Sequence, residues 1–337
     1  MRLASYNIEW FANLFDDNDR LVMDDRPSGR HGISRARQAE AVATVLAALD
    51  ADAVMVIEAP NTGRRQDTVR ALEGFAAAFA LRARRAVIGF ANDTDQEIAL
   101  LYDPDRIAVR HDPQGPPEGQ PEGGPAPRFD GAFRIDLDID AKPEVVRFSK
   151  PPLELAAETA AGTRLRLIGA HLKSKAPHGE TTRDGILRAA IANRRKQLAQ
   201  AIWLRARIAA HLARDEALIL MGDLNDGPGL DEFENLFGRS AVDILLGDEL
   251  FDPHARADRT RRPGPPPSTA RFAQPGTGRF LDALLDYIMI SPDLMARRPA
   301  WRIWHPFQDA GAAAVAELRA ALLDASDHFP VTLDIEI

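Results

Sequence analysis

Polar residues stand at the ends of several apolar, strand-like runs of this chain, and this arrangement constrains the fold more than any other feature of the sequence. The residues are Asn7 with Glu9, Glu58, His171, Asp223 with Asn225, Asp286, and Asp327 with His328. A buried charge is costly unless it is paired or binds a metal. Because ligand sites form where strand ends and loops meet, we expect these side chains to converge on one site.

Each residue also has a simpler explanation when it is taken alone. Asn7 suits a turn or a cap, and "GDLND" (222–226) suits a tight turn, since Gly, Asp and Asn are turn residues. His171 suits a hydrogen-bonded structural histidine. Asp286 is harder to explain in this way, because an aspartate in an apolar strand needs a partner. "SDHFP" (326–330) suits a turn before a final strand.

The remaining pattern predicts a layered α/β protein. Strand-like runs cover 2–8, 52–60, 131–139, 164–172, 217–226, 281–291 and 329–337, a hairpin is expected at 97–109 with its turn at 103–105, and helical patterns cover 34–49, 67–83 and 183–213. Ser34 and Asp67 suit helix N-caps. Mixed strands and helices indicate two packed sheets with helices on their outer faces. We expect a single domain over 1–337, with flexible loops at about 111–128 and 253–268.

Composition limits the chemistry. The chain has no cysteine, so any metal must be held by oxygen and imidazole nitrogen, which favours Mg²⁺ or Mn²⁺. The net charge of −8 argues against a protein that coats nucleic acid through bulk electrostatics. No signal peptide pattern and no apolar run of ~18 residues is evident, so we expect a soluble, cytoplasmic protein without a transmembrane segment. The sequence shows no sign of an obligate protein partner.

Seven segments carry a resemblance to a known family. They are "SYNIEWF", "VMVIEAPN", "KPPLEL", "GAHLKSK", "MGDLND", "LLDYIMIS" and "SDHFPV", in this order between residues 5 and 331. The chain resembles the endonuclease/exonuclease/phosphatase superfamily, which includes pancreatic DNases, apurinic endonucleases, neutral sphingomyelinases and inositol polyphosphate 5-phosphatases. The resemblance implies a DNase I-like four-layer α/β/β/α sandwich, in which two mixed β-sheets pack face to face between outer helices.

The resemblance also implies roles for single residues. Its metal ligands are Asn7, Glu58 and Asp327, and its catalytic residues are His171, Asp223, Asn225, Asp286 and His328. His171 matches the DNases, whereas apurinic endonucleases carry a tyrosine there. Lys173 and Lys175, two apart on an extended segment, share a face and are expected to point toward phosphate. Arg194 lies in "NRRKQ", which resembles a segment of bacterial members, and is expected to make a substrate or structural contact.

The chemistry can be argued independently of the resemblance. A phosphodiester is anionic, so its hydrolysis needs a cation on a non-bridging oxygen, a positioned water and charge relief on the leaving oxygen. Mg²⁺ on Glu58 can supply the first and Asp223, as general base, the second. His171 and His328 can supply hydrogen bonds or positive charge. A histidine paired with Asp286 should have a raised pKa. The sequence leaves open whether Asp223 or His328 takes the proton of the water.

We therefore expect a Mg²⁺- or Mn²⁺-dependent phosphodiesterase, in which an Asp-activated water attacks a phosphodiester substrate such as DNA, RNA or a nucleotide-type diester. The alternatives are a phosphomonoesterase and a sphingomyelinase-like lipid phosphodiesterase. A catalytically dead binding protein is less favoured, because every expected position is filled. Trp10 and Phe11 are candidates for base stacking, but we favour core packing for both.

Overall fold

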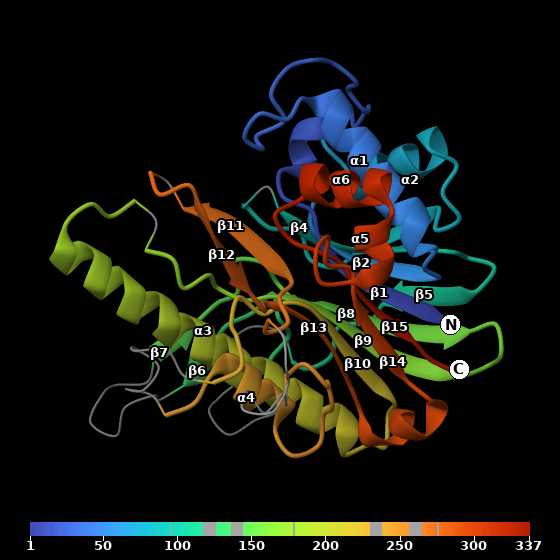
Figure 1. Ribbon diagram of the computed structural model, residues 1–337. Helices are drawn as coiled ribbons and strands as arrows, with labels where there is room; N and C mark the ends of the chain where they lie inside the picture. The colour runs from blue at the N-terminus through green and yellow to red at the C-terminus, as the bar shows by residue number, and fades with distance from the viewer. Residues whose placement is uncertain are drawn as a thin grey trace.

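The structure is a computed structural model that describes residues 1–94, 96–116, 126–135, 144–177, 179–229, 238–255, 265–274 and 276–337. It confirms the predicted four-layer sandwich (Figure 1). One sheet has six strands, in the order β14 (Ala300–Ile303), β15 (Val331–Asp334), β1 (Arg2–Asn7), β2 (Ala53–Ala59), β4 (Glu97–Tyr102) and β3 (Arg85–Ile88). The other has five, in the order β13 (Asp286–Ile290), β10 (Leu218–Asp223), β9 (Arg164–His171), β8 (Leu153–Thr159) and β5 (Ile107–His111).

Helices cover the outer faces of both sheets (Figure 1). On the six-stranded sheet they are α1 (Arg35–Leu49), α2 (Thr68–Ala78), α5 (Ala310–Ala314) and α6 (Ala316–Ala325), with the short η1 (Phe11–Leu14) beside them; on the five-stranded sheet they are α3 (Arg183–Leu212) and α4 (Ala241–Leu246). As predicted, Ser34 and Asp67 cap α1 and α2, because their side chains accept from backbone N–H groups of the first turn. The remaining elements are η3 (Pro292–Arg297) and two hairpins, β6 (Phe133–Ile135) with β7 (Glu144–Val146) and β11 (Ala270–Gln274) with β12 (Arg279–Ala283).

Three apolar cores separate the four layers. In β2, Val54 and Val56 face the helices, whereas Met55 and Ile57 face the other sheet. This alternation is the period of two of a strand that is buried on both faces. The third core lies between the five-stranded sheet and α3, where the indole of Trp203 is fully buried. Sheet faces that are sealed in this way leave the sheet edges as the places where polar side chains can meet solvent.

The hairpin predicted at 97–109 is wrong. The expected turn is present, since the N–H groups of Arg106 and Ile107 donate to the carbonyl of Asp103. However, β4 pairs with β2 and β3 in one sheet, and β5 pairs with β8 in the other. The buried Asp103 carboxylate also binds Arg82 and Arg84, which fixes the chain where it crosses between the sheets.

Two strand predictions need smaller corrections. The run 281–291 forms two strands, β12 and β13, because the N–H groups of Leu285 and Asp286 both donate to the Thr269 hydroxyl and bend the chain there. The final strand ends at Asp334, three residues before the last. The sequence pattern did not indicate β3, β7, β8, β11 or β14. The loops predicted at about 111–128 and 253–268, and the end of the strand predicted at 131–139, lie partly outside the described residues.

No helix in the described part of the chain is both long and apolar enough to cross a membrane.

Candidate active site

The polar strand ends meet at one edge of the two sheets. The strands β1 and β2 run parallel, as do β9 and β10, while β15 and β13 run antiparallel to their neighbours β1 and β10. The C-terminal ends of β1, β2, β9 and β10 therefore lie at the same edge as the N-terminal ends of β13 and β15. In β9, Leu167 belongs to the core between the sheets, and His171, four residues later, faces the same space. The residues with this orientation are Asn7, His171, Asp223 and Asp286, and all are buried.

Glu58 reaches this space through an irregularity in its strand. Simple alternation would point Glu58 toward the helices, as it does Val56. Instead the pairing of β2 with β4 shifts register between Ile57 and Ala59, and Glu58 has a φ of 60°. A bulge of this kind redirects a side chain. A left-handed conformation in a residue other than glycine costs free energy, and such strained residues are found clustered at active sites. Burial raises the pKa of the Glu58 carboxyl.

Asp223 lies at the centre of the site. Its Oδ2 accepts from the Asn7 side-chain amide at 3.0 Å, and its Oδ1 accepts from the backbone N–H of Asn225 at 2.7 Å. Gly222 makes this position possible: it has a φ of 141°, and a Cβ there would stand 1.9 Å from the carbonyl oxygen of Ala170. Burial raises the pKa of Asp223 to about 7, against the lowering effect of the nearby His328.

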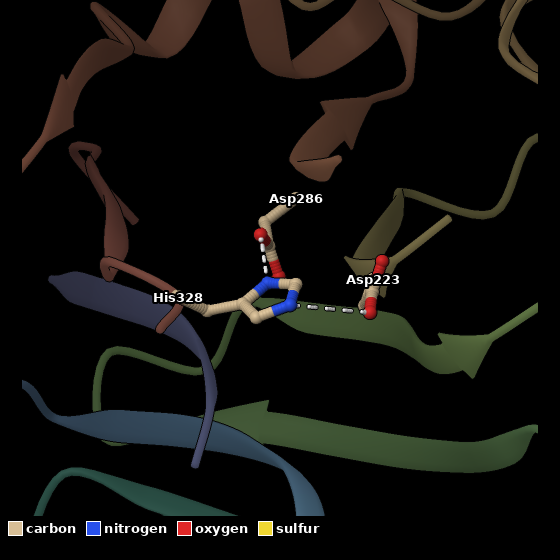
Figure 2. A group of neighbouring side chains, drawn as sticks. All are labelled: Asp223, Asp286 and His328. Carbon is tan, nitrogen blue, oxygen red and sulfur yellow. Dashed lines mark hydrogen bonds and ion pairs between the residues drawn. The ribbon is translucent and has the colours of Figure 1, made fainter. Parts of the chain in front are cut away.

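His328 forms the hydrogen bond with Asp286 that the sequence predicted. Its Nδ1 lies 2.8 Å from Asp286 Oδ2, and its Nε2 lies 4.0 Å from Asp223 Oδ2 (Figure 2). The ring is buried, which by itself would lower the pKa, but the Asp286 and Asp223 carboxylates outweigh burial and hold the pKa of His328 well above its ordinary value. His328 is therefore an imidazolium at neutral pH.

The turn that carries His328 is tied to the first strand. The Ser326 hydroxyl donates to the carbonyl of Asn7 at 2.8 Å and accepts from the N–H groups of Glu9 and His328. In addition, the N–H of Phe329 donates to the carbonyl of Thr269. One buried serine thus fixes the beginning and the end of the chain against each other at the site.

His171 differs from His328 in its protonation. Its Nδ1 faces the ammonium of Lys150 at 3.1 Å, and its Nε2 faces Asp223 Oδ2 at 3.6 Å. Burial, together with the positive charges of Lys150, His328 and Lys173, places the pKa of His171 well below its ordinary value. His171 is therefore a neutral ring that can supply a hydrogen bond to substrate but no positive charge.

A cleft of about 930 Å³ opens onto these residues. Its lining includes Asn7, Glu58, His171, Asp223, Asn225, Asp327 and His328, with Trp10, Phe272 and Leu281 at its sides. The expectation of core packing holds for Phe11, which is buried, but is wrong for Trp10, whose side chain is 46% exposed. Trp10 has a φ of 59° and donates its indole N–H to Glu9, which turns the ring out of the core.

The three basic residues that were expected to contact phosphate differ in their surroundings. Lys173 lines the cleft. Lys175 also lines it, and forms an ion pair with the buried Asp226 carboxylate. Arg194 is buried in α3, donates to the carbonyl of Ala190 at 3.2 Å, and is not among the described residues that line the cleft.

The donor set at this edge fits a hard cation. Among the candidate site residues, three buried oxygens have no hydrogen-bond partner in the described part of the chain: Asn7 Oδ1, Asp286 Oδ1 and Asp327 Oδ1. With the Glu58 carboxylate, the oxygens of Asn7 and Asp327 could hold Mg²⁺ or Mn²⁺. A second cluster, Asp223, Asp286 and His328, brings ligand atoms within 4.8 Å of one another. The first set offers only oxygen ligands, which Mg²⁺ and Mn²⁺ prefer, whereas the second set includes an imidazole nitrogen.

Two side chains at the site were not expected to have specific roles. Gln96 donates to Glu58 Oε2 at 2.7 Å and accepts from the Lys150 ammonium. No role was predicted for Lys150, which is the first residue of the segment "KPPLEL". Neither residue lies at an apolar strand end, and the segment "KPPLEL" was the one available signal for Lys150.

The sequence matches one known protein family over nearly its whole length. The model described as "Endonuclease/Exonuclease/phosphatase family" matches residues 4–328. The chain belongs to this family. Enzymes of the endonuclease/exonuclease/phosphatase family hydrolyse phosphate esters and typically depend on divalent metal ions. The Asn, Glu, His and Asp side chains at the sheet edge are thus the candidate active site of a family member. Among curated proteins, none matches this chain.

Solved structures support the fold. A family protein from Bacteroides thetaiotaomicron has a TM-score of 0.52 at 15% identity, with 99% of this chain and 96% of that chain covered. Truncated TDP2 from Caenorhabditis elegans has a TM-score of 0.52 at 15% identity, with 100% and 97% covered. The 3′ phosphatase NExo from Neisseria, bound to a product DNA hairpin, has a TM-score of 0.50 at 16% identity, with 100% of both chains covered. At these identities the similarity supports the fold and not a substrate.

Proposed function

We propose that this protein is a divalent-cation-dependent phosphodiesterase that acts on a DNA, RNA or nucleotide-type diester. The observation that carries the proposal is the position of Asp223. It is buried, is oriented by Asn7 and Asn225, has a pKa of about 7, and stands between a neutral histidine and an imidazolium at the base of a cleft. A carboxylate with these properties is suited to take a proton from water at neutral pH.

Each of these residues has a proposed role in the reaction. Glu58, Asn7 and Asp327 would hold the cation, which when bound neutralises negative charge on a non-bridging phosphate oxygen. Asp223 accepts the proton of the attacking water. The His328 imidazolium, oriented by Asp286, donates to a phosphate oxygen and stabilises the charge that develops there. His171 donates a neutral hydrogen bond, and Lys173 attracts the anionic substrate into the cleft.

Two model substrates test the proposal. Purified protein with Mg²⁺ or Mn²⁺ should hydrolyse bis-p-nitrophenyl phosphate, and EDTA should abolish the activity, which added Mg²⁺ restores. Asp223→Ala should remove the activity. A plasmid-nicking assay then tests for nuclease activity. If neither the wild type nor the Asp223→Ala protein turns over any phosphoester, the enzymatic proposal is wrong.

A phosphomonoesterase is the second candidate, because two similar structures are named as phosphatases. They are the Neisseria 3′ phosphatase and a mannosyl-6-phosphatase from Bacteroides thetaiotaomicron, which has a TM-score of 0.50 at 14% identity. A higher kcat/KM for p-nitrophenyl phosphate than for the diester would favour this candidate over the phosphodiesterase.

A further inference from the structure

Four side chains in contact with one another link the two sheets at the edge of the candidate active site. Glu58 Oε2 accepts from the Gln96 amide at 2.7 Å, Gln96 Oε1 accepts from the Lys150 ammonium, and the same ammonium lies 3.1 Å from His171 Nδ1. Glu58 and Gln96 belong to the six-stranded sheet and its loop, whereas Lys150 and His171 belong to the side of the five-stranded sheet. All four side chains line the cleft.

The chemistry of these side chains fixes which group donates and which accepts in each hydrogen bond. Burial lowers the pKa of Lys150, and the Glu58 and Asp223 carboxylates oppose this effect by favouring the ammonium form. An ammonium group has three donors and no acceptor, so the nitrogen of His171 that faces it must be the acceptor. The ring proton of a neutral His171 is then on Nε2, the atom that faces Asp223 and the cleft. The Gln96 amide satisfies both of its neighbours in a single orientation, because its oxygen faces a donor and its nitrogen faces an acceptor.

The charges around His171 agree with this arrangement. The groups that face it are the Lys150 ammonium on Nδ1, the Asp223 carboxylate near Nε2, and the more distant positive charges of His328 and Lys173. The contrast with His328 is direct: its Nδ1 faces the carboxylate of Asp286, which demands a proton on that nitrogen. In His171 the Lys150 ammonium takes the place of that carboxylate, so Nδ1 must be free of a proton.

We propose that Lys150 is a positioning residue, held by Gln96, that fixes His171 in the Nε2–H tautomer so that it presents a neutral hydrogen-bond donor to the substrate phosphate. The contribution to turnover rests on the phosphodiesterase function proposed above. The tautomer of His171 does not, and can be measured in the absence of substrate.

The primary experiment is long-range ¹H–¹⁵N NMR of ¹⁵N-histidine-labelled protein at about pH 7.5, a pH at which a free imidazole is neutral. The His171 signals are assigned by their loss in His171→Gln. We expect an unprotonated Nδ1 and a protonated Nε2 in the wild type, a mixture of tautomers in Lys150→Met, and the wild-type pattern in Lys150→Arg. A protonated Nδ1 in the wild type, whether on a neutral ring or an imidazolium, would overturn the proposal.

Kinetics give the second readout. Loss of a partner that orients a catalytic group typically costs about 10- to 100-fold, so Lys150→Met should lower kcat/KM for bis-p-nitrophenyl phosphate by that factor and Lys150→Arg should restore part of it. The matched control is Lys196→Met, which removes an equal charge from a lysine that donates to the neighbouring Ser149, and should leave both readouts unchanged. An unchanged tautomer and rate in Lys150→Met would contradict the proposal.

The two readouts separate the two proposals. If the NMR pattern is as expected but no variant or wild-type protein hydrolyses a phosphoester, the phosphodiesterase function fails and the assigned tautomer stands. If Lys150→Met does not fold, Gln96→Leu, which leaves the ammonium but removes its anchor, should still produce the tautomer mixture. A wild-type spectrum in a folded Gln96→Leu would then refute the positioning role of Gln96.

Discussion

Two buried histidines of this protein, His328 and His211, are hydrogen-bonded to carboxylates in different surroundings. His328 is hydrogen-bonded to Asp286 Oδ2 and lines the cleft. The other oxygen of this carboxylate, Asp286 Oδ1, has no hydrogen-bond partner among the described residues. His211, in α3, has both ring nitrogens in contact: Nε2 lies 2.7 Å from Glu154 and Nδ1 lies 2.7 Å from Glu216. We call His211, Glu154, Glu216, Arg166, Arg207 and Arg214 the His211 cluster.

The polar groups of the His211 cluster bind one another. Glu154 also accepts from the N–H of Gln114, and Glu216 from Arg166 and Arg214. Arg207 donates to the carbonyls of Gln114 and Ala126, on either side of the segment 117–125. The comparison teaches that a buried histidine–carboxylate pair does not by itself mark a catalytic site. The distinguishing feature is a carboxylate oxygen without a hydrogen-bond partner: both oxygens of Glu154 and of Glu216 are bonded, whereas Asp286 Oδ1 has no partner among the described residues. Four predictions test this comparison.

The largest effect is expected for Asp223→Asn. The amide cannot accept a proton from water, so kcat/KM for bis-p-nitrophenyl phosphate should fall by about 10³-fold, within the range for loss of a general base. The amide nitrogen cannot accept the hydrogen bonds that Asn7 or Asn225 donates to Asp223, but we expect the removal of a buried carboxylate, whose pKa burial has raised, to outweigh this loss in the folded protein. Calorimetry should show a melting temperature equal to or above that of the wild type. A lower melting temperature would indicate that Asp223 is a stabilising residue like those of the His211 cluster.

The next effect is on stability alone. The substitution His211→Leu leaves the buried Glu154 without its closest partner and should lower the free energy of unfolding by about 3 kcal/mol, measured by urea titration. The kcat of the folded fraction should not change, because His211 is outside the cleft lining. The substitution His328→Leu is the matched control, for which the loss should be mainly in kcat. Equal loss of kcat in both variants would break the comparison.

A smaller effect is expected for Asp286→Asn. The amide can still hold the ring, but it removes the negative charge that most raises the pKa of His328. That histidine then loses its proton at lower pH, so the fall of kcat/KM at high pH should begin at lower pH than in the wild type. At neutral pH the loss should be about 10- to 100-fold. An unchanged pH profile would show that the His328 charge has no part in turnover.

The smallest effect is expected in the wild-type protein, on the acidic side of the pH profile of kcat/KM. Asp223 is a base only when deprotonated, so kcat/KM should rise about tenfold per pH unit below its pKa and level off above it. In the metal-free protein this pKa should be about 7, measured by ¹³C NMR of the carboxyl carbon. A bound cation should lower it and move the acidic side of the profile to lower pH. An Asp223 carboxyl that stays deprotonated at about pH 5 without metal would contradict the assignment.

Much of this edge could be predicted because the strands impose a period of two. Once β1, β9 and β10 are recognised, the polar residue that ends each strand must face either the core or the cleft. Glu58 was predicted for its position after an apolar run, but nothing in the sequence reveals the bulge that redirects it. Gln96 and the role of Lys150 were missed for a related reason: both lie in loops, and only the packing of two sheets brings them together.

The hairpin at 97–109 shows a further limit of prediction from sequence. Turn residues indicate that the chain reverses, but not which sheet the next strand joins. That choice depends on the distant strand β8, which pairs with β5, and on Arg82, which binds Asp103 from another loop. In the same way, the charge pattern of "HLKSK" could not indicate that Lys175 would be paired with Asp226.

The serine that joins the two ends of the chain has a consequence for biosynthesis. Ser326 contacts Asn7 and Glu9, and β15 pairs with β1, so the most distant parts of the sequence are neighbours in space. Contacts of such high sequence separation form late in folding. During translation the N-terminal strand must wait for its partner until the ribosome has released residues 326–334, and His328 cannot reach Asp223 before then. The nascent polypeptide therefore carries an incomplete catalytic centre until these residues have left the ribosome.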